Sequence, residues 1–253
     1  MKALRMRKAK EIRTSMSIRE NVEEIQSRKA AAAQRSGRKA EDVLLIGVTK
    51  LHEPWEMEEA IAAGITDIAE NKVQEIQKKF DLIKSPVRWH LIGHLQTNKV
   101  KNIIDKVVMI HSVDSLHLAQ EIDKRAAGIG KTMDILLQVN AAHEESKFGV
   151  DPKDCRQLME EILESCPNVK IRGLMHIAPY SDDPEEVRPY FKEVKVLYDE
   201  LAKIEHPNAD FAYLSMGMSN DFETAIEEGA NIIRVGTSIF GARDYSKKMG
   251  GEQ

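Results

Sequence analysis

The chain has 253 residues, of which 42% are hydrophobic and 31% are charged, and its formal net charge is −4 at pH 7. This composition is typical of a globular protein and excludes a disordered chain, which would be poorer in apolar residues. A negative net charge gives no general attraction to nucleic acid or to an anionic membrane, so we expect neither as a partner.

Strands and helices are expected to alternate along the chain. A helix over residues 18–35 comes first, and short apolar runs then predict strands at 43–49, 66–70, 88–92, 108–112, 133–140, 170–177, 211–215 and 232–235. Amphipathic stretches between them predict helices at 55–63, 116–127, 153–165 and 184–204. Gly64 and Gly229, in the matching phrases EAIAAGITDI and TAIEEGANII, stand where C-cap glycines end a helix.

This alternation fits two folds, a closed (β/α)8 TIM barrel and an open doubly wound sheet. An open sheet usually carries a glycine-rich phosphate loop after its first strand, but no GxGxxG or GxxxxGKS/T motif follows residues 43–49. Eight strands and a length of about 250 residues match the barrel. No Pro/Gly/Ser-rich linker divides the chain, so we predict one domain over residues 1–253.

The ends of the chain and its cysteines bear on its location. The basic N-terminus lacks the apolar core of a secretory signal, and no run approaches the roughly 20 apolar residues of a transmembrane helix. Cys155 and Cys166 are too few for a disulfide scaffold and do not have metal-ligand spacing. These features predict a cytoplasmic protein with inert thiols, in which residues 1–16 form a flexible arm.

Lys50 ends the apolar run VLLIGVTK, at the rim where a barrel carries its functional residues. A lysine at the end of a strand is most often a solvated terminus. The other interpretation is a buried amine with a lowered pKa, which can condense with a carbonyl group. Lys50 by itself does not decide between the two.

The loops after the last two strands favour the second interpretation. LSMGMSND (214–221) contains Ser215 and Ser219, and RVGTSIFG (234–241) contains Gly236 and Thr237. Barrels often hold phosphate groups in these loops, where glycine lets backbone N–H groups approach and hydroxyls add neutral donors. A lysine opposite such a phosphate cup is the arrangement that pyridoxal 5′-phosphate (PLP) needs.

Arg234 lies two residues before Gly236, so strand alternation would send both side chains inward or both outward. An inward Arg234 could donate a hydrogen bond to the pyridine nitrogen of PLP, leaving the ring a weaker electron sink than a carboxylate partner would. This disfavours chemistry that requires a strongly stabilised carbanion. The alternative interpretation is a salt-bridged barrel arginine.

Histidine spacing predicts no metal site. His90 and His94 have i,i+4 spacing, but HLIGH lacks the glutamate of HExxH and lies on a strand-to-loop segment. Met216 and Met218 flank Gly217 and could pack against a bound cofactor, although methionine usually fills the core.

Several phrases resemble one family. They are VTK (48–50), AEN followed by KVQE (69–75), WHLIGHLQTNK (89–99), QVNAAHEESKFGV (138–150), RGLMHI (172–177), LSMGMSNDFETAIEEGA (214–230) and RVGTSIFGARDY (234–245). In this order they resemble the pyridoxal-phosphate homeostasis protein family, which is similar to the N-terminal barrel of alanine racemase standing alone. The resemblance implies a (β/α)8 TIM barrel of PLP fold type III.

The resemblance also implies roles for residues that match its motifs. Lys50 would carry the covalent Schiff base, Arg234 would face the ring nitrogen, and Ser219, Gly236 and Thr237 would contact the phosphate, in the loops that also hold Ser215. Asn71 would line the cofactor face, in a segment where Ala69 replaces the glycine of the usual GEN. Lys99 and Lys147 match recurrent lysines near the barrel mouth and are interpreted as auxiliary or transfer lysines.

Three functions remain open. The first is a PLP-binding protein of intracellular PLP homeostasis that stores, buffers or delivers the cofactor, affects amino-acid and vitamin B6 balance and has no dedicated catalytic activity. We expect such a protein to be monomeric and to contact PLP-dependent apoenzymes transiently.

The second function is a PLP-dependent amino-acid racemase, which needs an acid/base group on each face of the substrate Cα. Proteins similar to alanine racemase take their second base, a tyrosine, from a C-terminal domain, and we expect none in a chain ending at Gln253, although Tyr180, Tyr213 and Tyr245 are conceivable substitutes. The third function is a barrel that binds a sugar phosphate, with Lys50 only structural.

Overall fold

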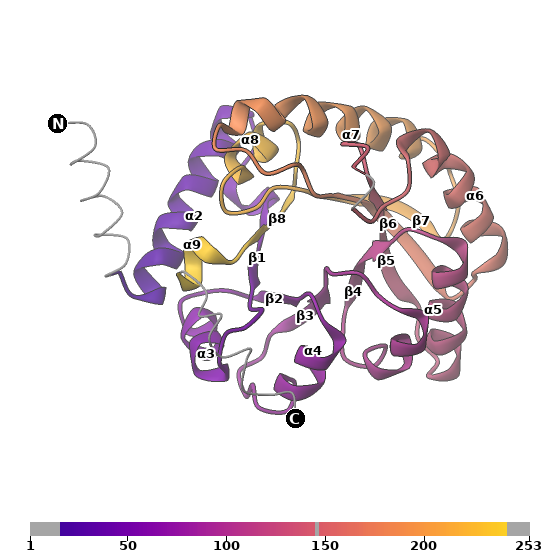
Figure 1. The fold of residues 1–253 in the computed structure, drawn as a ribbon, viewed down its shortest axis with the longest axis horizontal. Helices are drawn as coiled ribbons and strands as arrows, with labels where there is room; N and C mark the ends of the chain where they lie inside the picture. The colour runs from indigo at the N-terminus through magenta and orange to yellow at the C-terminus, as the bar shows by residue number, and fades with distance from the viewer. Residues whose placement is uncertain (1–15, 145–146, 242–253) are drawn as a thin grey trace.

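Eight parallel strands pair in sequence order and close into a barrel (Figure 1). The computed structural model describes residues 16–144 and 147–241, so residues 1–15 of the predicted arm lie outside the described part. The strands are β1 (Leu44–Val48), β2 (Asp67–Glu70), β3 (Arg88–Leu91), β4 (Met109–Val113), β5 (Met133–Val139), β6 (Val169–His176), β7 (Ala209–Ser215) and β8 (Ile232–Val235). The closed barrel is confirmed, and the open doubly wound sheet is wrong.

Helices form a ring outside the strands (Figure 1). They are α2 (Ile18–Arg35), α3 (Pro54–Ala62), α4 (Val73–Lys79), α5 (Leu116–Gly128), α6 (Cys155–Ser165), α7 (Arg188–Leu201), α8 (Phe222–Glu227) and α9 (Thr237–Phe240). Short 3-10 turns add η1 (Ala40–Asp42), η2 (Thr97–Asn102), η3 (Pro152–Asp154) and η4 (Pro184–Val187). Among the described residues, no helix is both long and apolar enough to span a membrane.

The predicted helices differ from the observed ones at two places, one where a proline interrupts the helix and one where the helix is short. The stretch 184–204 divides into η4 and α7, because Pro189 has no N–H with which to continue an α-helical ladder from the preceding turn. α4 was not predicted, since its seven residues give too few turns for a clear period. Gly64 and Gly229 follow the ends of α3 and α8 with φ of +107° and +104°, which confirms them as C-cap glycines.

Strand alternation separates two layers of core. A large apolar cluster fills the space between the strands and the helices. Inside the barrel, two smaller clusters are centred on Ile46, Val48 and Ala69 and on Met109, Leu136 and Met175. The same inward-facing register includes buried polar residues from five strands, namely Asp67, His90, His111, Ser215 and Arg234.

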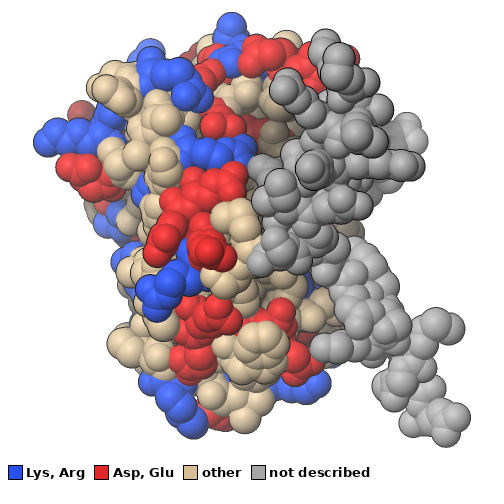
Figure 2. Space-filling view, turned by 90° about the vertical axis from the view of Figure 1, so that its left-hand side faces the viewer, with Lys and Arg blue, Asp and Glu red and all other residues tan. Residues whose placement is uncertain are grey.

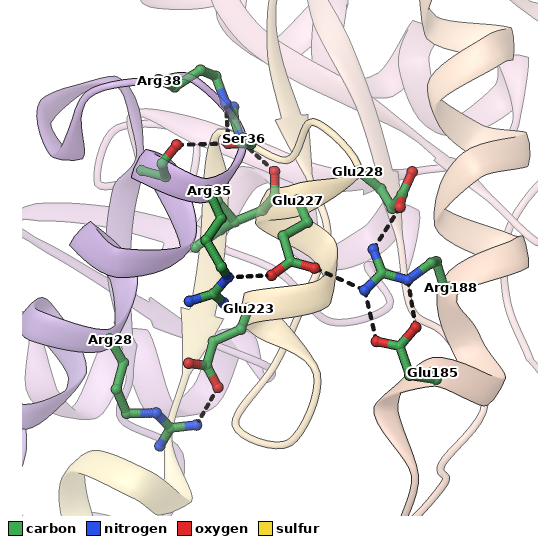
Figure 3. Close-up of polar contacts among 11 residues, drawn as sticks. Arg28, Arg35, Ser36, Arg38, Glu185, Arg188, Glu223, Glu227 and Glu228 are labelled. Atoms are coloured by element: carbon green, nitrogen blue, oxygen red, sulfur yellow. Dashed lines mark hydrogen bonds and ion pairs between the residues drawn. The ribbon is translucent and has the colours of Figure 1, made fainter.

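The opening helix α2 covers the side of the barrel where α8 and α9, of six and four residues, are short (Figure 1). Ion pairs connect it to α8, with Arg28 Nη2 at 2.8 Å from Glu223 and Arg35 Nε at 2.7 Å from Glu227 (Figure 3). Glu227 also meets Arg188 of α7. The network therefore joins three helices. On the face that includes α2, acidic and basic side chains are interspersed (Figure 2).

Candidate functional site

A pocket of about 560 Å³ opens at the carboxyl ends of the strands. Six of the seven predicted site residues line it, and they come from the ends of β1, β2, β7 and β8: Lys50, Asn71, Ser219, Arg234, Gly236 and Thr237. The carboxyl rim is where (β/α)8 barrels place their functional groups. The structure therefore brings together residues that lie up to 187 positions apart in the chain.

Lys50 reaches the pocket because Ile46 and Val48 of β1 face the barrel interior and alternation continues to position 50. The turn that carries it is held on both sides. Lys79 Nζ donates to Thr49 O at 2.9 Å, and Leu51 N–H donates to Glu75 Oε2 at 2.8 Å. Leu51 has φ of +66°, a conformation that side chains with a Cβ rarely adopt.

Behind this turn lies an ionic cluster of the buried Glu70 and Lys79 and the half-buried Glu75. Lys79 Nζ lies 2.7 Å from Glu70 Oε1 and 2.9 Å from Glu75 Oε2, and Glu70 also accepts from the Thr49 hydroxyl at 2.7 Å. Burial raises the pKa of Glu70 to about 7, although the charge of Lys79 opposes this. Glu70 Oε2 is buried without a hydrogen-bond partner in the described residues. Sequence reasoning missed the cluster, because Glu70 faces outward from β2 and its partners Glu75 and Lys79 come from another element, α4.

The loops after β7 and β8 meet at the predicted phosphate cup. Ser238 N–H donates to Ser219 Oγ at 3.4 Å, which joins the two loops. Gly217 turns the first loop with φ of +94°, and a Cβ there would lie 2.6 Å from the Cβ of Ala225. Asp221 closes the turn by accepting from Met218 N–H at 2.5 Å. Burial raises the pKa of Asp221, a pocket residue that sequence reasoning also missed.

Arg234 points inward and lines the pocket together with Gly236, as alternation predicts. Its guanidinium donates to Ser215 Oγ at 2.7 Å and to His176 O at 2.9 Å. Burial lowers the pKa of Arg234 to about 10, with Asp221 opposing the change, so the side chain is still a cation at neutral pH. Ser215 was expected at the cofactor, but it is fully buried and lies outside the pocket lining. The structure places it as a partner of Arg234.

The two auxiliary lysines have different positions. Lys147 lines the pocket, where its Nζ lies 3.0 Å from Glu144 Oε1, and it also borders an adjoining cavity of about 170 Å³. Lys99 lies on η2 and is not part of the lining. Among the described residues of the lining, the charged groups are thus Lys50, Lys147 and Arg234 against Asp221. This excess of positive charge suits an anionic ligand.

Of the tyrosines and methionines considered from the sequence, Tyr180 and Met218 line the pocket. Tyr180 lines the pocket at 78% exposure, and its hydroxyl donates to Asp182 at 2.8 Å. Tyr213 packs against the clusters inside the barrel, and Tyr245 lies outside the described residues. Met218 lines the pocket, whereas Met216 is in the core.

The histidines of HLIGH lie apart. His90 is inside the barrel, and the ring of His94 stacks on Phe148 with centroids 3.8 Å apart. In residues 16–144 and 147–241, no group of histidine, cysteine, aspartate and glutamate side chains could hold a metal ion.

The fold and the pocket define a (β/α)8 barrel with a lysine after its first strand, an arginine on its last strand and a cup of two loops beside them. The family described as "Alanine racemase, N-terminal domain" matches residues 17–244. The chain belongs to this family.

Individual relatives resemble the chain over most of its length. It is 46% identical over 231 residues to the pyridoxal phosphate homeostasis protein of Aquifex aeolicus, an alignment that covers 91% of this chain and 100% of the relative. Among solved structures, an unknown protein from Bifidobacterium adolescentis has a TM-score of 0.83 and 35% identity, covering 88% of this chain and 94% of that one. PipY from Synechococcus elongatus, solved with PLP bound, has a TM-score of 0.72 and 38% identity, covering 79% and 93%.

Proposed function

We propose that this protein binds pyridoxal 5′-phosphate and acts in intracellular PLP homeostasis by storing, buffering or delivering the cofactor. One observation carries the proposal: a single pocket joins Lys50, Arg234 and the loops after β7 and β8. The names of relatives up to 46% identical and the PLP-bound structure of PipY support it.

The residues of the pocket fit this cofactor. Asn71 Oδ1 is a buried acceptor without a hydrogen-bond partner in the described residues, and its side chain lines the pocket, so a donor on a ligand would satisfy it. The excess of cationic side chains complements a phosphate group. A volume of about 560 Å³ lies within the usual range for pockets that hold small ligands.

When bound, PLP supplies an aldehyde carbon that an amine can capture and a pyridine ring that can withdraw electrons. Lys50 is the amine that β1 delivers to the pocket, and the residues around its turn fix its position. Ser219, Gly236 and Thr237 would hold the phosphate at the meeting point of the two loops. Arg234 would donate to the ring nitrogen from the barrel interior.

A racemase has less support. It needs a second acid/base group beside the substrate Cα, and the tyrosine of the described lining is Tyr180. The hydroxyl of Tyr180 donates to Asp182, and this hydrogen bond with a carboxylate raises its pKa. Tyr180 is therefore poorly suited to accept a proton at neutral pH.

The proposal also includes a cytoplasmic location and transient contact with PLP-dependent apoenzymes. Cys155 and Cys166 are buried free thiols, and burial raises the pKa of Cys155 to about 12, as expected of inert cysteines in a reducing cytoplasm. Phe148, Tyr180 and Met218 are exposed apolar residues near the pocket, where a PLP-dependent apoenzyme could dock on a monomer of this protein.

The test is an absorption spectrum of the purified protein after incubation with PLP, followed by borohydride reduction and peptide mapping. We expect a new visible band and a reduced label on Lys50, and neither in Lys50→Ala. Absence of the band in the unaltered protein would overturn the proposal and favour a sugar-phosphate barrel. Interconversion of L- and D-alanine above trace rates would instead establish the racemase.

A further inference from the structure

A chain of five buried side chains crosses the interior of the barrel. Asp67 Oδ1 lies 2.8 Å from His90 Nε2, and His90 Nδ1 lies 3.0 Å from His111 Nε2. His111 Nδ1 lies 3.0 Å from Ser215 Oγ, which accepts from Arg234 Nη1 at 2.7 Å. Each of these residues is at most 3% exposed. Four hydrogen bonds thus connect β2, β3, β4, β7 and β8.

The two ends of the chain fix the direction of its two terminal hydrogen bonds. Arginine can only donate, so Ser215 Oγ accepts from Arg234, and an ionised Asp67 can only accept, so His90 donates from Nε2. With one proton on each imidazole, His111 donates from Nε2 to His90, and the Ser215 hydroxyl donates to His111 Nδ1. Every donor then points from the cation at the pocket toward the carboxylate.

The electrostatics agree with this assignment. Burial alone would raise the pKa of Asp67, but hydrogen bonds from His90, Arg88 and Thr66 outweigh it and hold the pKa below its usual value. Burial, together with His90 and Arg234, lowers the pKa of His111 well below its usual value. Asp67 is therefore an anion and His111 is neutral at physiological pH.

We propose that Ser215, His111, His90 and Asp67 are positioning residues that fix the guanidinium of Arg234 toward the ring nitrogen of the bound cofactor. This inference rests on the proposed function. Arg234 Nη2 donates to His176 O, and Arg234 Nη1 donates to Ser215 Oγ. The Ser215 hydroxyl donates its own proton to His111 Nδ1, so its oxygen is left to accept from Arg234. The guanidinium is thereby anchored at two nitrogens.

Filling the barrel does not explain the chain. Ile46, Met109 and Leu136 occupy neighbouring inward positions without any desolvation of polar groups. Apolar side chains of similar volume in place of a buried polar network are often neutral or stabilising. The chain reaches the pocket at one group, Arg234, through Ser215, so its effect on the pocket is on the orientation of that group.

The experiment compares the dissociation constants of PLP and of its deaza analogue, in which a C–H group replaces the ring nitrogen. In the unaltered protein we expect PLP to bind about tenfold or more tightly, because only PLP accepts a hydrogen bond from Arg234. Ser215→Ala and Asp67→Asn should reduce this ratio to a few-fold at most, and Ser215→Thr should restore it.

Ser112→Ala is the matched control. Ser112 is a buried serine next to His111, but its hydroxyl donates to Gly93 O and takes no part in the chain. A merely structural effect of Ser215→Ala would weaken both ligands equally and leave their ratio unchanged, and that result would overturn the inference. If the unaltered protein binds neither aldehyde, the proposed function fails first. If it binds PLP on Lys50 with the same ratio in every variant, the positioning role alone is wrong.

Discussion

Lys79→Met is expected to destabilise the protein, because it removes the ammonium group and keeps an unbranched side chain that is shorter by one atom. Lys79 is 6% exposed, and its Nζ makes hydrogen bonds of 2.9 Å to Thr49 O, 2.7 Å to Glu70 and 2.9 Å to Glu75. Removing one partner of a buried ion pair costs about 3–5 kcal/mol. Because the pKa of Glu70 is already about 7, this residue can take up a proton and stay neutral. We therefore expect a loss of about 3 kcal/mol, at the lower end of that range.

Urea unfolding followed by far-UV circular dichroism measures this loss. Lys78→Met is the control, since Lys78 is the exposed neighbour on the same helix and should change the unfolding free energy by about 0.5 kcal/mol or less. Adding Glu70→Gln to Lys79→Met removes both partners of the shortest pair, so the double variant should lose less than the sum of the single losses. A Lys79→Met protein as stable as the Lys78→Met control would refute the reasoning.

Three further predictions concern the same rim. The pKa of Glu70 is raised from 4.5 to about 7 in the folded protein, so the folded state holds the extra proton and the unfolding free energy should fall as pH rises between these values, by at most about 3 kcal/mol. Glu70→Gln should remove this slope, which urea midpoints at about pH 5 and about pH 8 can measure. Thr237→Ala should weaken PLP binding by about 1.5–3 kcal/mol in equilibrium titration, and an unchanged affinity would exclude Thr237 from the phosphate site. Gly217→Ala should destabilise the protein by at least about 1 kcal/mol in thermal unfolding, because φ is +94° and the new Cβ would lie 2.9 Å from the Phe222 Cα. Gly37→Ala is the control: it has the strain of a positive φ but no neighbour within 4 Å, so it should cost less.

Local patterns were sufficient for the fold. The eight strands were predicted because each is a short apolar run, and their ends agree with the structure to within about two residues. Their number then led to the barrel, and the barrel led to the rim, where Lys50, Ser219 and Thr237 do lie together. These residues lie together because a parallel barrel places the carboxyl ends of all its strands on one face.

Contacts between strands were beyond the reach of the sequence. Ser215 was assigned to the cofactor because it stands beside the phosphate loop, but its side chain faces Arg234 and His111 in the interior. Alternation could have marked His90 and His111 as inward-facing on adjacent strands. Whether two such side chains meet depends on the register between the strands, which a one-residue shift would change.

The short strand β2 connects the two buried networks to the pocket. Asp67 faces inward and ends the chain of hydrogen bonds that begins at Arg234, whereas Glu70 faces outward and belongs to the ionic cluster behind the turn of Lys50. Asn71 follows on the inward face and lines the pocket itself. Because unpaired charges inside a protein are costly, both networks hold their partners firmly. A displacement of β2 would therefore disturb Lys50 and Arg234 together. The position of this strand thus sets the geometry of the proposed cofactor site.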